Sequence, residues 1–128
     1  MGEQAKPKKR VLIVDDEPHI GKIFSIKLRL AGYDVITTTR GAEAIELIRT
    51  HHPDIILLDI FMPDVNGLDV LSEVRTFSAV PVIIFSARPG VEELATRYGA
   101  NDSIAKPFDP DTLVEKIRLV LQAEGTST

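Results

Sequence analysis

Short runs of aliphatic residues alternate along this chain with stretches of helical periodicity, and this alternation restricts the possible folds more than any other feature. The apolar runs lie at residues 11–14, 35–36, 55–58 and 82–85, with a weaker one at 103–105. Three of them are almost uninterrupted, as expected for strands buried on both faces of a parallel sheet. Between them, apolar residues recur at intervals of three and four, which is typical of amphipathic helices. Five strands alternating with five helices predict βαβ units with right-handed crossovers, and therefore a three-layer α/β fold around a parallel sheet.

Glycine, asparagine and proline residues mark the expected helix ends. Gly32 and Gly99 follow the first and fourth helical patterns, where glycine is the preferred residue just beyond a helix. Asn66, or Pro63-Asp64, is expected to begin the third helix. Asp109-Pro110 supplies an N-cap and a first-turn proline for the last helix.

Length and charge limit the class of protein. A chain of 128 residues fits one domain, which we expect over residues 10–122, with a disordered lead at 1–9 and a tail at 123–128. The chain has no cysteine, which excludes disulfides and thiolate metal sites. Its 15 basic and 19 acidic residues give a net charge of -4, which argues against nucleic-acid binding. With no apolar run near the ~20 residues of a membrane span and no signal-peptide pattern, we expect a cytoplasmic domain that binds no membrane.

Charged and polar residues follow the predicted strands at the edge where their carboxyl ends meet. Asp15-Asp16-Glu17 follows the first strand, Asp59 ends the third, Ser86 ends the fourth and Lys106 follows the fifth. In open parallel sheets this edge is where sites form. Crowded carboxylates repel one another unless one is protonated or a cation lies among them, and Mg²⁺ prefers oxygen ligands of this kind. An ammonium group, a hydroxyl donor and a free carboxylate beside Mg²⁺ predict transfer of a phosphoryl group to an aspartate.

These residues belong to a set of ordered motifs that resembles a known family. The chain is similar to the receiver (REC) domain of two-component response regulators over about residues 10–122. The resemblance rests on motifs that occur in order at residues 14–18, 53–63, 66–67, 81–87 and 106–108. It implies a flavodoxin-like fold with five strands in the order 2-1-3-4-5.

The resemblance also implies a role for each residue of the site. Asp59 would be the phosphoacceptor in a Mg²⁺-dependent reaction, and its donor would be a sensor histidine kinase or a histidine phosphotransfer protein. Asp16, Asp59 and the backbone carbonyl of Phe61 would ligate Mg²⁺, and Asp15 would act mainly through bound water. The domain would be a phosphoprotein of phosphorelay signal transduction rather than an enzyme, with only self-phosphorylation and self-dephosphorylation as activities.

The remaining implied roles concern the phosphoryl group and the partners. Ser86 would hydrogen-bond the phosphoryl group and Lys106 would pair with it, with a cis bond before Pro107. The first helix, near Ile20 to Phe24, would help dock the phosphodonor. The surface from the fourth helix through the last would bind a downstream protein or form a homodimer.

One position departs from the family pattern, because Ser103 stands where the family usually has Tyr or Phe. That aromatic residue is thought to change rotamer on activation. The usual coupling from Ser86 to the output surface is therefore in question here.

Three other classes of protein share parts of this pattern. A Mg²⁺-dependent phosphohydrolase would need an aspartate two residues after its nucleophile, where this chain has Phe61. A flavin-binding domain would need a phosphate-binding loop rich in Ser, Thr and Gly at residues 15–17, where acids would repel phosphate. A pseudo-receiver that no longer turns over phosphate would be expected to lack part of the acid, Ser86 and Lys106 set. Whether the domain stands alone or belongs to a longer protein is left open.

Overall fold

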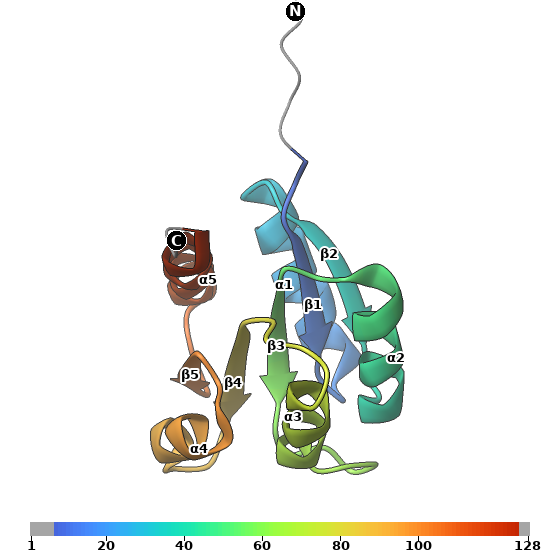
Figure 1. Ribbon diagram of the computed structural model, residues 1–128. Helices are drawn as coiled ribbons and strands as arrows, with labels where there is room; N and C mark the ends of the chain where they lie inside the picture. The colour runs from blue at the N-terminus through green and yellow to red at the C-terminus, as the bar shows by residue number, and fades with distance from the viewer. Residues whose placement is uncertain (1–6, 126–128) are drawn as a thin grey trace, which may run out of the picture.

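The structure is a computed structural model that describes residues 7–125, and its secondary structure alternates strand and helix from start to end. The elements are β1 (Arg10–Val14), α1 (Pro18–Leu30), β2 (Asp34–Thr38), α2 (Gly41–His51), β3 (Ile55–Asp59), α3 (Gly67–Arg75), β4 (Val82–Ser86), α4 (Val91–Tyr98), β5 (Asp102–Ala105) and α5 (Pro110–Gly125). The five strands are parallel and form one sheet in the order β2-β1-β3-β4-β5 (Figure 1). The predicted fold class and strand order are confirmed.

The sheet separates two apolar cores, because alternate strand residues point to opposite faces. On one face, Val11 and Ile13 belong to the cluster that includes Phe24 of α1 and Ile117 of α5. On the other, the cluster draws its residues from α2, α3 and α4, including Ala44, Ile48, Leu68, Leu71, Val74, Val91 and Ala95. The central strands are therefore buried on both sides, which explains why their sequences are almost purely apolar.

The strand register brings the predicted site residues to one edge of the sheet. Val14 of β1 lies opposite Leu58 of β3, so that the residues which follow them, Asp15 and Asp59, are neighbours. On the other side of β3, Asp59 lies opposite Phe85 of β4. These positions are fixed by the hydrogen bonding of buried strands, and the edge is therefore a rigid platform.

The helix ends agree with the sequence signals except at the C-terminal end. The Asn66 side chain caps α3 by accepting a hydrogen bond from the Leu68 amide, while Gly32 and Gly99 have positive φ angles of 100° and 81°. Asp109 accepts a bond from the Asp111 amide at the start of α5. The helix α5, however, continues past residue 122 to Gly125, into the expected tail. Residues 1–6 and 126–128, which complete the expected lead and tail, lie outside the described part of the chain.

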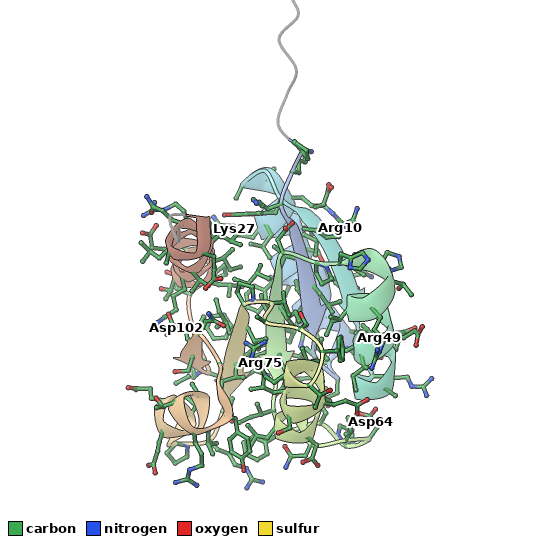
Figure 2. The ribbon with its side chains drawn as sticks, viewed as in Figure 1. Arg10, Lys27, Arg49, Asp64, Arg75 and Asp102 are labelled. Atoms are coloured by element: carbon green, nitrogen blue, oxygen red, sulfur yellow. The ribbon has the colours of Figure 1, made fainter. Side chains whose placement is uncertain are left out.

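Arg75 at the end of α3 joins the segments that precede β4 and β5 (Figure 2). Its guanidinium donates hydrogen bonds to the carbonyl oxygens of Val80 at 2.7 Å and Gly99 at 3.1 Å. It also contacts Asn101, whose side chain accepts a bond from the Val82 amide.

Among the described residues, no helix is long and apolar enough to cross a membrane.

We predict that Gly67→Ala disturbs the backbone that carries Asp59. A Cβ atom on Gly67 would lie 2.5 Å from the Asp59 carbonyl oxygen and 2.5 Å from the Ile60 Cα, both of which are backbone atoms. Overpacking of this kind costs about 1–3 kcal/mol of unfolding free energy. Urea unfolding should show this loss.

The matched control is Gly21→Ala in α1. A Cβ there would meet only the Thr37 side chain, at the ordinary contact distance of 3.5 Å. Alanine also favours helix over glycine by up to about 1 kcal/mol. Equal stabilities of the two variants would contradict the close approach at Gly67.

Candidate functional site

Three aspartates gather at the carboxyl edge of the sheet, as predicted. One carboxylate oxygen from each of Asp15, Asp16 and Asp59 lies within 4.8 Å of the others. Asp15 and Asp59 are only 2% and 4% exposed, whereas Asp16 is half-buried. The backbone orients the two buried groups, because Asp15 accepts a hydrogen bond from the Glu17 amide at 2.9 Å and Asp59 accepts one from the Phe61 amide at 3.1 Å.

A single ammonium group compensates the two buried carboxylates. Lys106 Nζ lies 3.3 Å from Asp15 Oδ2 and 3.4 Å from Asp59 Oδ2. It also lies 4.8 Å from the centre of the Phe85 ring, which supports it from β4. The backbone of Lys106 is held by a hydrogen bond from its amide to the Ser86 carbonyl, and the bond to Pro107 is cis, as expected.

Burial and charge move the pKa values of this cluster. Burial raises the pKa of Asp59 to about 6, against the opposing effects of the Phe61 amide and Lys106. Burial also raises the pKa of Asp15. For Lys106, burial alone would lower the pKa, but the charges of Asp15 and Asp59 outweigh it and raise the pKa. With one cation against three acids, the cluster retains net negative charge at neutral pH.

The donor atoms left free in the cluster suit a hard divalent cation. Within residues 7–125, the Asp16 carboxylate has no hydrogen-bond or ion-pair partner, and the Phe61 carbonyl accepts no hydrogen bond. Together with the unused lone pairs of Asp15 and Asp59, they form an all-oxygen donor set. This is the ligand chemistry that Mg²⁺ prefers, and the excess negative charge favours its binding.

Ser86 lies on the adjacent strand and does not contact the carboxylates. It is 1% exposed, and its hydroxyl accepts a hydrogen bond from the Arg88 amide at 3.0 Å. Within the described chain, the Ser86 hydroxyl makes no hydrogen bond to Asp59 or Lys106, and Ser86 is joined to Lys106 only through the backbone. The structure therefore brings together Asp15, Asp16, Asp59 and Lys106, and places Ser86 beside them at the end of β4.

The contact between Arg88 and Phe61 was not predicted. The Arg88 guanidinium lies 4.4 Å from the centre of the Phe61 ring, so the loop after β4 touches the loop after β3. Both side chains are exposed. Their positions two residues after Ser86 and Asp59 place them near the site, but the sequence contains no signal that the two side chains would stack.

The expected docking segment on α1, near Ile20 to Phe24, stays a prediction, and within it the Phe24 side chain is largely buried. Its ring stacks on that of Phe108 with centroids 5.1 Å apart and belongs to the core. The exposed large apolar side chains of this helix are Ile23, which lies within that segment, and Ile26 and Leu30, which follow it; they are 51%, 60% and 82% exposed. At spacings of three and four, they form one apolar stripe on the outer face of α1.

Comparison with known proteins identifies the family to which these features belong. The profile of the response regulator receiver domain family matches residues 11–118. A probable transcriptional regulator, ycf27, of Guillardia theta is 43% identical over 117 residues, which cover 90% of this chain and 46% of the relative. The transcriptional regulatory protein KdpE of Mycobacterium tuberculosis is 39% identical over 114 residues, covering 88% of this chain and 50% of KdpE. The chain thus spans about half the length of these curated relatives.

Solved structures agree with the sequence comparison. A CheY-like response regulator receiver domain protein from Methanospirillum hungatei has a TM-score of 0.87 at 28% identity, over 93% of this chain and 98% of that one. The response regulator TrrA from Thermotoga maritima, solved in complex with Mg²⁺ and BeF, has a TM-score of 0.80 at 32% identity, over 88% of this chain and 98% of that one.

We predict that Asp59→Asn stabilises the metal-free protein in a pH-dependent manner. Asp59 has a raised pKa of about 6 in the folded state, against 3.8 as its ordinary value. Above pH 6 the fold must therefore bury a charge that the unfolded chain leaves hydrated, so the variant should be more stable by up to about 3 kcal/mol.

The extra stability of Asp59→Asn over the wild type should disappear as the pH falls from about 6 to about 4. In this range Asp59 of the folded wild type takes up a proton, and its carboxyl group is then buried without a charge. Urea unfolding in EDTA measures the difference between the two proteins. A difference that does not change with pH across this window would contradict the raised pKa of Asp59.

Proposed function

The chain belongs to the response regulator receiver domain family of two-component systems, and from this premise we propose that Asp59 is its phosphoacceptor. The carboxylate of Asp59 attacks the phosphorus of a phosphohistidine, and the bond from phosphorus to the histidine nitrogen breaks as the acyl phosphate forms. The supporting observation is the buried Asp59 carboxylate held beside Asp15 and Lys106. We also propose that the domain has no activity beyond gaining and losing this phosphoryl group.

The surrounding residues suit a dianionic phosphoryl group. Lys106 is already 3.4 Å from Asp59, where its ammonium can stabilise developing phosphoryl charge. The Ser86 hydroxyl is free to donate a hydrogen bond, since within the described chain it only accepts one, from Arg88. Both groups therefore assist through charge and hydrogen bonding, and Asp59 alone forms the covalent bond.

We propose that Mg²⁺ is held by Asp15, Asp16, Asp59 and the carbonyl of Phe61, with Asp15 acting mainly through water. When bound, the ion would neutralise the acidic cluster and the phosphoryl oxygens. The unpartnered Asp16 carboxylate and Phe61 carbonyl support this set.

The phosphodonor is proposed to be a histidine kinase or a histidine phosphotransfer protein that docks on α1. The exposed stripe of Ile23, Ile26 and Leu30 offers apolar surface for a partner helix. No acid occurs in α1; Lys22 and Arg29 flank the stripe, and Lys27 beside it is paired with Asp111 of α5 at 2.6 Å. A partner helix with acidic residues beside its apolar face would complement this surface.

The second candidate function is that of a pseudo-receiver, and phosphorylation experiments distinguish it from a receiver domain that accepts phosphate. It would keep the fold but would not accept phosphate, and it is disfavoured because Asp15, Asp16, Asp59, Ser86 and Lys106 are all present. A phosphohydrolase is disfavoured, because the position that would carry its acid and base is Phe61, whose ring transfers no protons.

Incubation with Mg²⁺ and a small-molecule phosphodonor should add one phosphoryl group to the wild type, as measured by intact mass. Asp59→Asn should not be labelled, because the amide cannot form the acyl phosphate. The control is Asp69→Asn, an exposed acid on α3 with no side-chain partner among the described residues, which should be labelled like the wild type. Full labelling of Asp59→Asn would contradict the assignment, and no labelling of the wild type would favour a pseudo-receiver.

Millimolar Mg²⁺ should raise the melting temperature of the wild type, because a ligand that binds only the folded state stabilises it by about 2.7 kcal/mol at a hundredfold excess over Kd. Asp16→Asn should respond much less, since it loses a ligand without disturbing a buried ion pair. Asp69→Asn should respond like the wild type. If Asp16→Asn shifts as much as the wild type, Asp16 is not a ligand.

A further inference from the structure

The loop between β3 and α3 supplies the cap for the first turn of α2. Asp64 of this loop (labelled in Figure 2) accepts a hydrogen bond at 3.2 Å from the amide of Gly41, the first residue of α2. The first amides of a helix have no carbonyl partner within the helix. Arg40, which precedes Gly41, makes no capping bond with its side chain. The start of α2 is therefore capped from a different segment of the chain.

The same loop packs tightly against Gly41. A Cβ atom on Gly41 would lie 2.1 Å from Val65 Cγ1 and 3.0 Å from Val70 Cγ2, so no larger residue fits unless these side chains move. Gly41 is buried and Asp64 is exposed. The loop thus rests on α2 through one hydrogen bond at its surface and one close apolar contact beneath it.

The start of α2 is also joined to the segment that carries Asp15 and Asp16. Thr38, at the end of β2, donates a hydrogen bond from its hydroxyl to Glu43 in the first turn of α2. Its carbonyl accepts a bond from the Asp15 amide at 3.1 Å. One helix end therefore contacts both segments that hold the proposed metal ligands, since the loop on its other side contains Phe61.

The turn between Phe61 and Asn66 is closed at its base. These two residues pair as an antiparallel bridge, and the Gly67 amide donates a hydrogen bond to the Ile60 carbonyl at 2.9 Å. Asp64 lies inside this closed turn. A displacement of the turn away from α2 would therefore be transmitted to the backbone of Phe61.

We propose that Asp64 and Gly41 are positioning residues for the cation site. Their contact holds the Phe61 carbonyl at a fixed place relative to Asp15 and Asp16, although neither residue touches the ion. Met62, directly after Phe61, is only 8% exposed and also anchors the turn, so loss of the contact should weaken cation binding without abolishing it. The inference rests on the Mg²⁺ site of the proposed function.

Titration with Mg²⁺, followed by amide chemical shifts, tests the inference. Asp64→Ala should raise the Kd for Mg²⁺ by about tenfold, as is usual when a group that orients metal ligands is lost. Asp64→Asn should bind Mg²⁺ nearly as well as the wild type, because its amide oxygen can still accept the bond from Gly41. Both variants lose the same charge, so a difference between them reports the hydrogen bond alone. Gly41→Ala, which displaces Val65, should also weaken binding.

The matched control is Asp69→Ala, which removes an exposed acid from α3 and should leave the Kd unchanged. In EDTA, Asp64→Ala should shift the amide resonances of Gly41 and Phe61, whereas Asp69→Ala should not. Urea unfolding separates a role in the site from a role in the fold. A loss of stability in Asp64→Ala with an unchanged Kd would overturn the inference, because the contact would then serve the fold only.

Two further results would contradict the proposed role of Asp64. Equal weakening by Asp64→Asn and Asp64→Ala would show that charge matters and the hydrogen bond does not. Absence of saturable Mg²⁺ binding in the wild type would overturn the metal site itself, and this inference with it. The other contrary results leave the metal site and the phosphorylation of Asp59 standing.

Discussion

The fold of this domain buries Asp15 and Asp59 side by side, so that their two carboxylates repel each other. Parallel strands all end at the same edge, and the pairing of Val14 with Leu58 leaves the following acids no way to move apart. Lys106 contacts both carboxylates from the end of β5. The sheet thus supplies both the repulsion and its partial compensation, and the remaining negative charge suits the binding of a cation.

Much of this arrangement could be predicted from the sequence, because parallel sheets turn a linear pattern into a spatial one. Once the apolar runs are identified as parallel strands, the residues after each run must share an edge, and Asp15, Asp59 and Lys106 follow directly. The order of the strands came only from family resemblance, since periodicity does not specify which strands are neighbours. Helix caps such as Asn66 were predictable because their hydrogen bonds are local.

What could not be predicted depends on contacts between distant segments. On α1, apolar residues occupy more than one face, and only the packing against Phe108 decides that Phe24 is buried while Ile23 is exposed. The stacking of Arg88 on Phe61 joins two loops whose relative positions are set by β3 and β4. The end of α5 at Gly125 was missed for a different reason: the sequence does carry a glycine there, but the apolar periodicity of the helix stops at Leu121.

Phe108 links the two outer surfaces of the domain. Its ring stacks on Phe24 of α1, and the same residue lines a pocket beside Ser103. Phe108 follows Lys106 by two residues. The short segment that carries the Lys106 charge opposite Asp15 and Asp59 therefore also contacts α1 and the pocket beside Ser103. A shift of Lys106 toward a phosphoryl group would therefore be transmitted both to α1 and to the pocket beside Ser103 without an aromatic side chain at position 103.

The stack of Arg88 on Phe61 bears on how long a signal would last. Removal of a phosphoryl group from an aspartate requires a water molecule aligned with phosphorus, opposite the bond that breaks. The Phe61 ring has no hydrogen-bonding atom to orient such a water, and the Arg88 guanidinium lies 4.4 Å from the centre of that ring. If Asp59 is the phosphoacceptor as proposed, the acids and Lys106 would govern the formation of the acyl phosphate, whereas Phe61 and Arg88 would govern its lifetime, so the response and its duration would depend on different residues.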